Sequence, residues 1–271
     1  MKIGFLQFSP ALGDVNATIR SIDRLLKGMG HADVLVLPEL CNSGYNFESF
    51  DQAWQTSERI KEGVFAQYLE AICARRKCFI VSGFNERYRE RLYNSAILVG
   101  PEGFIGKYRK LHLFMREKDF FTPGDNEPIV FNVGKCKLGM LICFDWIFPE
   151  VWRILAIKGA DLICHPSNLV LPGFAQRAIP IHALINRVFI VTANRIGSEG
   201  EMTFTGLSTI ADPRGEVLAQ ASETEEKVGL AEMDPALARD KMVTARNHVI
   251  KDRRPDLYSL LTATGRRTKL Q

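Results

Sequence analysis

Three short segments, far apart in the chain, each place one chemically reactive side chain directly after a strand-like run of residues. The three groups are the carboxylate of Glu39, the ammonium of Lys110 and the thiol of Cys143. A thiol that lies beside a base and a cation can attack the carbon of a carbon–nitrogen bond. The segments therefore predict an enzyme with a cysteine nucleophile, provided that the fold brings their ends together.

Cys143 follows the apolar run 138–142 and precedes a helix that is expected to begin at Pro149. A single cysteine in an apolar strand is usually just a small buried residue. Here the strand opens toward a helix, so the thiol is predicted to lie at a strand-to-helix elbow. The first N–H groups of a helix lack partners within it and can bind a developing oxyanion. We therefore predict that Cys143 is the nucleophile.

Two carboxylates and one ammonium are candidates for the groups that assist the thiol. Glu39 alone is typical of a surface carboxylate, but in a partly apolar pocket it could take the thiol proton as a general base. Lys110 lies in a basic run that could be solvated; fixed beside the thiol, it would lower the thiol pKa and stabilise an anionic intermediate. Glu117 could hold Lys110 and steer substrate or water. His112 and His165 suggest a cysteine–histidine dyad, but histidines beside apolar strands are more often core groups.

Composition and charge exclude several classes of protein. The chain has 271 residues, 46% hydrophobic and 24% charged, which is typical of a globular protein. Its net charge of +4 is too small, and its basic residues too dispersed, for a nucleic-acid-binding face. No apolar run approaches the roughly 20 residues that span a bilayer, and the first residues do not resemble a signal peptide. We expect neither nucleic acid nor a membrane as a partner.

The cysteines show no paired spacing of the kind that binds zinc or forms a disulfide framework. We therefore expect no metal and a reducing, cytoplasmic location. The six cysteines are Cys41, Cys73, Cys78, Cys136, Cys143 and Cys164.

Strand-like and helix-like runs alternate along the chain, which favours mixed α/β sheets covered by helices. No flexible linker interrupts them, so we expect one domain over residues 1–261 and a tail over 262–271. Ser57 is the expected N-cap of the second helix. The patterns predict helices at 16–29, 57–76, 149–158 and 174–186, and strands at 3–8, 33–37, 78–84, 93–99, 104–108, 129–133, 137–142, 162–165, 188–194, 205–211 and 227–233.

The reactive segments, taken in order, resemble the nitrilase superfamily of carbon–nitrogen hydrolases. Any one of the matching motifs is weak, but together they follow the order and spacing of that family over residues 2–258. The motifs are Pro38-Glu39-Leu40, Tyr108-Arg109-Lys110-Leu111-His112-Leu113, Phe120-Phe121-Thr122-Pro123-Gly124, Ile142-Cys143-Phe144-Asp145, Phe148-Pro149-Glu150, His165-Pro166-Ser167-Asn168 and Thr192-Ala193-Asn194-Arg195-Ile196-Gly197.

The resemblance implies a four-layer α-β-β-α sandwich that assembles into homodimers or larger homo-oligomers. It also implies roles: Glu39 as the general base, Lys110 as the stabiliser of the oxyanion, Cys143 as the nucleophile and Glu117 as a second glutamate that is placed structurally. The backbone N–H of Phe144 would be the other oxyanion donor. The acyl group would pass to the thiol as a thioester, and water would then release the acid. No metal and no organic cofactor are implied.

The residues after the nucleophile are expected to line the substrate pocket, with Phe144 and Trp146 as its walls. Tyr45 could add a polar contact, and so could Asn168 at a strand end. No arginine follows Cys143 closely, and a substrate carboxylate would favour one. A small, neutral, aliphatic amide is therefore the expected small-molecule substrate. An aliphatic nitrile and an N-carbamoyl compound remain alternatives, and so does a catalytically silent member that acts as a scaffold.

Overall fold

Two six-stranded mixed sheets form the centre of the computed structural model, which describes residues 1–263. In the first sheet, β1, β2 and β3 run parallel, and antiparallel strands flank them on both sides. In spatial order the strands of this sheet are β14 (Lys227–Glu232), β1 (Lys2–Gln7), β2 (Val34–Val36), β3 (Phe79–Tyr88), β4 (Arg91–Gly100) and β5 (Gly103–Arg109).

The second sheet repeats this plan with the parallel strands β7, β8 and β9 at its centre. Antiparallel strands again lie on both sides of them. In spatial order the strands are β13 (Val217–Gln220), β12 (Thr209–Ala211), β9 (Phe189–Asn194), β8 (Leu162–Ser167), β7 (Cys136–Met140) and β6 (Val130–Val133).

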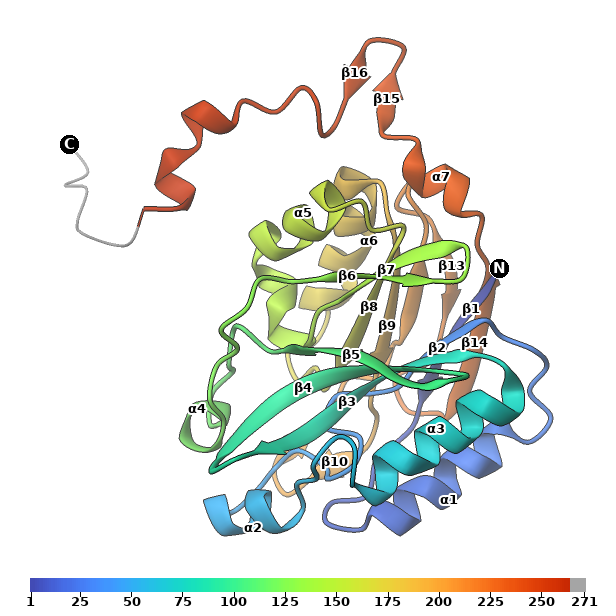
Figure 1. Ribbon diagram of the computed structural model, residues 1–271, viewed down its shortest axis with the longest axis vertical. Coiled ribbons are helices and arrows are strands. Elements are labelled where there is room, and N and C mark those ends of the chain that lie inside the picture. Colours follow the sequence, from blue (N-terminus) through green and yellow to red (C-terminus); the bar gives the residue numbers. More distant parts are fainter. Residues whose placement is uncertain (264–271) are drawn as a thin grey trace.

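Helices cover the outer face of each sheet (Figure 1). α1 (Val15–Leu26) and α3 (Val64–Arg76) pack on the first sheet. α5 (Pro149–Ile157) and α6 (Phe174–Asn186) pack on the second. Apolar residues from the inner faces of both sheets form one continuous core between them. The expected α-β-β-α sandwich is thus confirmed.

The local sequence explains where most helices begin. Asp14 caps α1 by accepting a hydrogen bond from the backbone N–H of Ala17 at 2.9 Å. Pro149 occupies the first turn of α5, where its missing N–H costs nothing. The expected helix at 57–76 is wrong in its first turns, because α3 begins only at Val64 and Ser57 is not its cap.

A strand contact explains this difference. Glu58 forms a parallel bridge with Glu86 of β3, which holds the chain before α3 in an extended form. The side chain of Glu58 then accepts hydrogen bonds from the backbone N–H of Phe65, at 3.2 and 3.1 Å. Glu58 therefore supplies from outside the helix the capping contact that Ser57 was expected to give.

The remaining elements are short. The chain after β14 leaves the sandwich as an extended arm at one end of the molecule (Figure 1). Of the expected tail 262–271, residues 264–271 lie outside the described residues. Within residues 1–263, no helix has the length and apolar character needed to cross a membrane. The short elements are α2 (Phe50–Gln55), α4 (Glu117–Phe120), β10 (Ser198–Glu199), β11 (Met202–Thr203), α7 (Pro235–Arg239), β15 (Met242–Thr244), β16 (Asn247–His248) and the 3₁₀ turns η1 (Cys143–Ile147), η2 (Pro255–Leu257) and η3 (Ser259–Leu261).

Candidate active site

The topology brings the three reactive side chains to one end of the sandwich. Glu39 follows β2, Lys110 follows β5, and both strands belong to the first sheet. Cys143 follows β7 at the centre of the second sheet. Since β2 and β5 run in the same direction, their carboxyl ends lie at the same edge, where the loops of an α/β sheet commonly form a site.

Lys110 forms the centre of a buried ion-pair network. Its Nζ donates to Oε1 of Glu39 and to Oε1 of Glu117, each at 2.7 Å. Lys110 and Glu39 are 0% exposed and Glu117 is 4% exposed, so water does not screen these charges. The structure thus brings together the two glutamates and the lysine that were predicted as site residues.

Glu39 is held by both side-chain and backbone contacts. The Nδ2 of Asn94 on β4 donates to its Oε1 at 2.7 Å, and Nδ2 of Asn168 donates to its backbone carbonyl at 3.0 Å. Its second carboxylate oxygen, Oε2, is buried and has no hydrogen-bond partner among the described residues. One oxygen is therefore fixed by two donors, and the other remains able to accept a proton.

Glu117 is fixed equally firmly. The hydroxyl of Tyr45 donates to its Oε1 at 2.7 Å, and the backbone N–H of Phe114 donates to its Oε2 at 3.2 Å. The Tyr45 hydroxyl is thus engaged with Glu117 in this structure. A contact between Tyr45 and the substrate remains a prediction. Both oxygens of Glu117 accept hydrogen bonds, which suits a carboxylate that positions Lys110.

The segment that carries Tyr45 is tied to a second buried ion pair. Glu199 accepts hydrogen bonds from the backbone N–H groups of Tyr45 and Asn46, at 2.9 and 2.7 Å. Arg195, which is 0% exposed, pairs with Glu199 and lies over the ring of Phe204. Arg195 thus links the end of β9 to the loop that supports Glu117.

Cys143 lies at the predicted elbow and has a left-handed backbone conformation, with φ of 40°. It begins the turn η1, which leads into α5. Nε2 of His165 lies 2.9 Å from the backbone carbonyl of Cys143, while Nδ1 faces the hydroxyl of Thr192. Burial lowers the pKa of His165 to about 4, so the neutral ring donates through Nε2. This histidine supports the elbow and does not contact the thiol as a base.

Asp145 joins the elbow to the chain around Lys110. Its Oδ2 accepts from the Tyr108 hydroxyl and from the Ile142 N–H, both at 2.9 Å. Nδ1 of His112 lies 2.7 Å from its Oδ1. The ring of His112 also stacks on Phe148, with centroids 3.6 Å apart. His112 therefore connects the segment after β5 to the segment after β7. These contacts differ from the cysteine–histidine dyad that the sequence suggested.

Burial and the two carboxylates set the protonation of the site. Burial raises the pKa of Cys143, Glu39 raises it further, and the opposing effect of Lys110 is smaller. Burial lowers the pKa of Lys110, but Glu117 and Glu39 outweigh it, so the net pKa is raised. Lys110 thus lowers the pKa of the thiol, as expected, but burial and the two glutamates outweigh this effect. The resting group is a neutral thiol, which requires a base when it attacks.

A small apolar cavity opens onto Cys143. Its volume is about 10 Å³, near the minimum for one water molecule. The predicted residues Phe144, Trp146 and Asn168 line it, which places three of the four candidate substrate contacts beside the thiol. Two further residues of the site were not predicted from the sequence: Asn94, and Phe114, whose ring centroid lies 4.9 Å from that of Phe144. Neither residue comes directly after a strand-like run, which was the pattern that selected Glu39, Lys110 and Cys143. The remaining wall residues, also not predicted, are Leu169, Val170 and Leu171.

Within residues 1–263, no group of three or more histidine, cysteine, aspartate or glutamate side chains is arranged to hold a metal ion. The charged groups of the site instead satisfy one another through the Lys110 network. The arrangement can supply a nucleophile, a proton acceptor and a fixed cation at one place, which is what acyl transfer requires.

Comparison with known proteins identifies the family. Residues 2–241 match the family described as Carbon-nitrogen hydrolase. The chain is 47% identical to a protein named nitrilase from Pyrococcus abyssi, over 95% of this chain and 99% of that protein. It is 35% identical to an (R)-stereoselective amidase from Pseudomonas sp., over 94% of this chain and 92% of that protein. The structure of an amidase from Nesterenkonia sp. superposes with a TM-score of 0.80, at 24% identity and 96% coverage of both chains. The match over most of the chain, the sandwich fold and the buried Glu39–Lys110–Cys143 arrangement agree, and the chain belongs to the carbon–nitrogen hydrolases of the nitrilase superfamily.

Proposed function

We propose that this enzyme hydrolyses a small, neutral, aliphatic amide to the acid and ammonia through a thioester on Cys143. The observation that carries the proposal is the unpartnered Oε2 of Glu39, in a buried network whose ammonium faces the same site as the thiol. A proton acceptor and a fixed cation beside a neutral thiol meet the needs of acyl transfer.

In the first half of the reaction, Sγ of Cys143 attacks the carbonyl carbon of the amide while Oε2 of Glu39 takes the thiol proton. The carbonyl oxygen becomes an oxyanion that accepts hydrogen bonds from Nζ of Lys110 and the backbone N–H of Phe144. That N–H lies in the first turn of η1, where helical N–H groups lack internal partners. The carbon–nitrogen bond then breaks, and Glu39 returns the proton to the leaving nitrogen, which departs as ammonia.

In the second half, a water molecule attacks the thioester carbon and Glu39 takes one of its protons. The same two donors stabilise the second oxyanion. The carbon–sulfur bond breaks, the acid leaves, and the proton passes from Glu39 back to the sulfur of Cys143. Glu117 holds the Lys110 ammonium throughout, so the cation remains in place while the proton on Glu39 moves.

The cavity supports the choice of a small neutral substrate. Its lining beside Cys143 is formed by apolar and aromatic residues, with Asn168 as the polar exception. No cation other than Lys110 pairs with the described groups of the network, and both of its carboxylate contacts are occupied. A substrate carboxylate would therefore lack the paired cation that its burial requires.

A nitrile is the second candidate, because the Pyrococcus abyssi relative is named a nitrilase. The test is ammonia release from a matched series of short aliphatic amides and nitriles, with Cys143→Ala as the control. We expect release from amides that is lost in the variant. Release from nitriles alone would move the proposal to nitrile hydrolysis, and amide turnover that survives in Cys143→Ala would refute the nucleophile.

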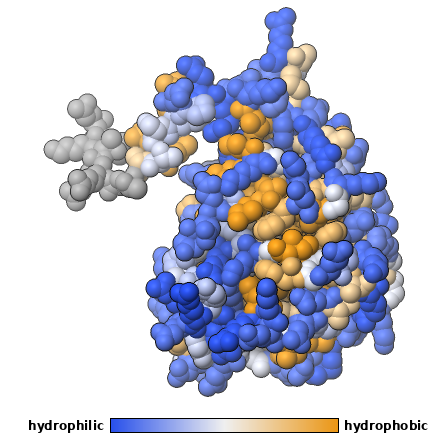
Figure 2. All heavy atoms as spheres, viewed as in Figure 1, coloured by the Kyte–Doolittle hydropathy of each residue, from blue (hydrophilic) through white to orange (hydrophobic). Residues whose placement is uncertain are grey.

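We also propose that the enzyme is a homodimer or larger homo-oligomer in the cytoplasm. Apolar side chains gather on the face that carries α5 (Figure 2), and Ile181, Leu184 and Ile185 of α6 are 39–53% exposed. All six cysteines are free, which suits a reducing compartment. Light scattering after size-exclusion chromatography tests the assembly: we expect a mass of at least twice 30.5 kDa, and a monomer would refute it.

A further inference from the structure

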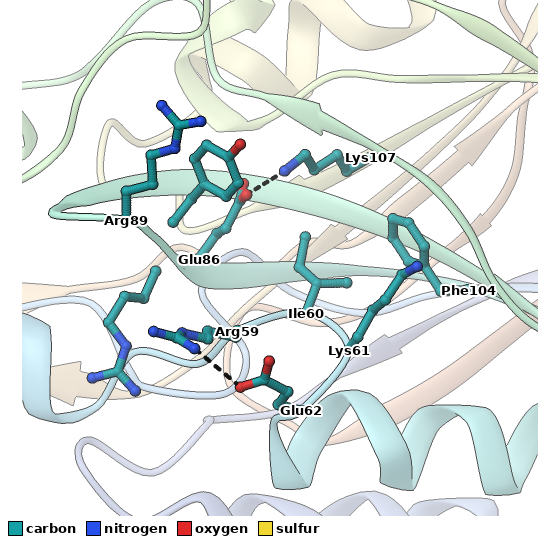
Figure 3. Close-up of a pocket in the computed structure, with 10 residues that line it drawn as sticks. Arg59, Ile60, Lys61, Glu62, Glu86, Arg89, Phe104 and Lys107 are labelled. Atoms are coloured by element: carbon teal, nitrogen blue, oxygen red, sulfur yellow. Dashed lines mark hydrogen bonds and ion pairs between the residues drawn. The ribbon is translucent and has the colours of Figure 1, made fainter.

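A second cavity, of about 460 Å³, lies on the outer face of the first sheet. Its walls are the loop 59–62, the end of the β3–β4 hairpin and part of β5, and Figure 3 shows Ile60 between the loop and the strands. Successive side chains of a strand point to opposite faces. Tyr108 of β5 points toward the core, as does Lys110 directly after the strand, so Lys107 lies on the other face of the sheet.

This outer cavity carries a strong positive charge. Arginine and lysine supply five of its lining residues, and glutamate supplies two, a surplus of three positive charges. The net charge of the whole chain is only +4. A concave surface with a surplus of one charge attracts ligands of the opposite charge. The five cationic residues are Arg59, Lys61, Arg87, Arg89 and Lys107.

The buried carboxylate of Glu86 does not neutralise the whole cavity. It already accepts from Ser95 at 2.6 Å, from Arg109 at 2.9 and 2.6 Å, and from Lys107. Burial raises the pKa of Glu86, but the bonds from Arg109 and Lys107 outweigh it, and the net pKa is lowered. Glu86 is thus an ionised group that holds Lys107 in the wall of the cavity and Arg109 beside it, and both of its oxygens already accept hydrogen bonds.

Other cations of the cavity have no carboxylate partner among the described residues. Lys61 and Arg89 take part in no ion pair within residues 1–263, whereas Arg59 pairs with Glu62 at 3.4 Å. Nε of Arg87 is buried without a hydrogen-bond partner in that part of the chain. Figure 3 shows Lys61 beside Phe104, and Arg89 on the opposite wall. Lys61 and Arg89, which pair with no carboxylate in that part of the chain, therefore lie on opposite sides of the cavity, and the Arg89 guanidinium points away from Lys61.

The cavity also offers flat apolar surface. Tyr88 is 46% exposed, but Arg89, Lys107 and Arg109 already lie 5.4, 5.3 and 5.0 Å from its ring centroid, so the free flat surface is that of Phe104. Ile60 and Phe104 complete the apolar wall. An aromatic ring can stack on such a surface while an anionic group attached to it meets the cations.

We propose that this outer cavity binds a small phosphate-bearing ligand with a flat ring, of the chemical class of a nucleoside monophosphate. Lys61 contacts the phosphate beside Phe104, Arg89 adds positive charge from the opposite wall, and the ring packs against Phe104 and Ile60. The volume is within the range of cavities that hold small ligands, roughly 300–1,000 Å³. This site is separate from the cavity at Cys143, because the first sheet lies between them.

Isothermal titration calorimetry of the full chain tests the proposal with AMP, inorganic phosphate and adenosine as probes. We expect AMP to bind at least tenfold more tightly than inorganic phosphate, and adenosine to give no measurable binding. The double variant Lys61→Gln/Arg89→Gln should raise the Kd for AMP at least tenfold. The matched control Lys27→Gln/Arg246→Gln removes the same two charges from exposed positions outside the cavity and should change it less than twofold.

Ammonia release and thermal unfolding of both double variants should equal those of the wild type, which shows that they fold. The proposal is overturned if AMP binds the two double variants equally well, if adenosine binds as tightly as AMP, or if AMP does not bind the wild type. A single-stranded oligoribonucleotide that binds a hundredfold more tightly than AMP would also overturn it, in favour of a macromolecular partner.

Discussion

Gly83 on β3 allows the backbone to pass directly behind Glu39. A Cβ atom at this position would lie 2.2 Å from Cα of Glu39 and 2.5 Å from the backbone nitrogen of Leu40. Both are backbone atoms, so no side-chain rotation can relieve the contact. Leu40 already has a left-handed backbone, with φ of 46°, which leaves this turn little freedom to adjust. We therefore expect Gly83→Ala to displace the base.

The size of the displacement follows from the contact. Ordinary van der Waals contact begins at 3.4 Å, so an approach of 2.2 Å requires a movement of 3.4 minus 2.2, or 1.2 Å. The bond from Lys110 to Glu39 is 2.7 Å, and a shift of that size would break it. A misplacement of about 1 Å can cost roughly a hundredfold in rate, and overpacking costs about 1–3 kcal/mol of stability. We therefore expect Gly83→Ala to lower both the reaction rate and the free energy of unfolding.

The assay is kcat/KM for ammonia release, measured beside urea unfolding. Gly30→Ala is the control for the glycine change itself, because a Cβ there meets nothing within 4 Å. Gly229→Ala is the control for instability, because its Cβ would lie 2.2 Å from the ring of Phe5, outside the catalytic network. We expect Gly83→Ala to lose at least a hundredfold in kcat/KM. Activity within fivefold of wild type, or an equal loss in Gly229→Ala, would refute the reasoning.

Three further outcomes concern buried charges and thiols. Lys110→Met leaves Glu39 and Glu117 without their shared cation, and should lower the free energy of unfolding in urea by about 3–5 kcal/mol; unchanged stability would contradict the ion-pair network. Asp145→Asn puts an amide N–H₂ where an oxygen now accepts a hydrogen bond, and should lower kcat/KM by about 10–100-fold; full activity would show that the elbow needs no such anchor. Burial raises the pKa of Cys143, so the folded state keeps this thiol protonated while the unfolded chain ionises near pH 8.5. Stability should therefore fall as pH rises above about 8.5, and Cys143→Ala should reduce that slope by about 1.4 kcal/mol per pH unit, measured by urea unfolding at several pH values; an identical slope would contradict the raised pKa.

Hydrophobic periodicity was sufficient to predict the alternation of strands and helices, whereas the four layers of the sandwich were implied by the resemblance to the family. The helix expected at 174–186 matches α6 in both bounds, and the strand expected at 78–84 lies within β3 apart from its first residue. The spacing of apolar residues along a segment indicates which of its sides will be buried, and this spacing is visible in the local sequence. The error at Ser57 has a tertiary cause, since the bridge between Glu58 and Glu86 depends on a strand far along the chain.

The candidate site also contains residues that the sequence predicted and residues that it did not. A strand end followed by a reactive side chain is visible in the sequence, and this pattern selected Glu39, Lys110 and Cys143. Asn94 lies inside β4 and looks like any strand residue, yet it donates to Glu39. Its role depends on the pairing of β4 with its neighbours, which the local sequence does not specify.

The sequence by itself determined which reactive groups this protein has, their order, and the alternation of strands and helices that carries them. Only the tertiary structure decided which partner each charge meets. Lys107 and Lys110 lie in the same basic run, but one pairs with Glu86 on the outer face and the other with Glu39 in the core. The reason is physical: neighbouring strand residues point to opposite faces, and the register between strands and the packing of the two sheets select the contacts across that face.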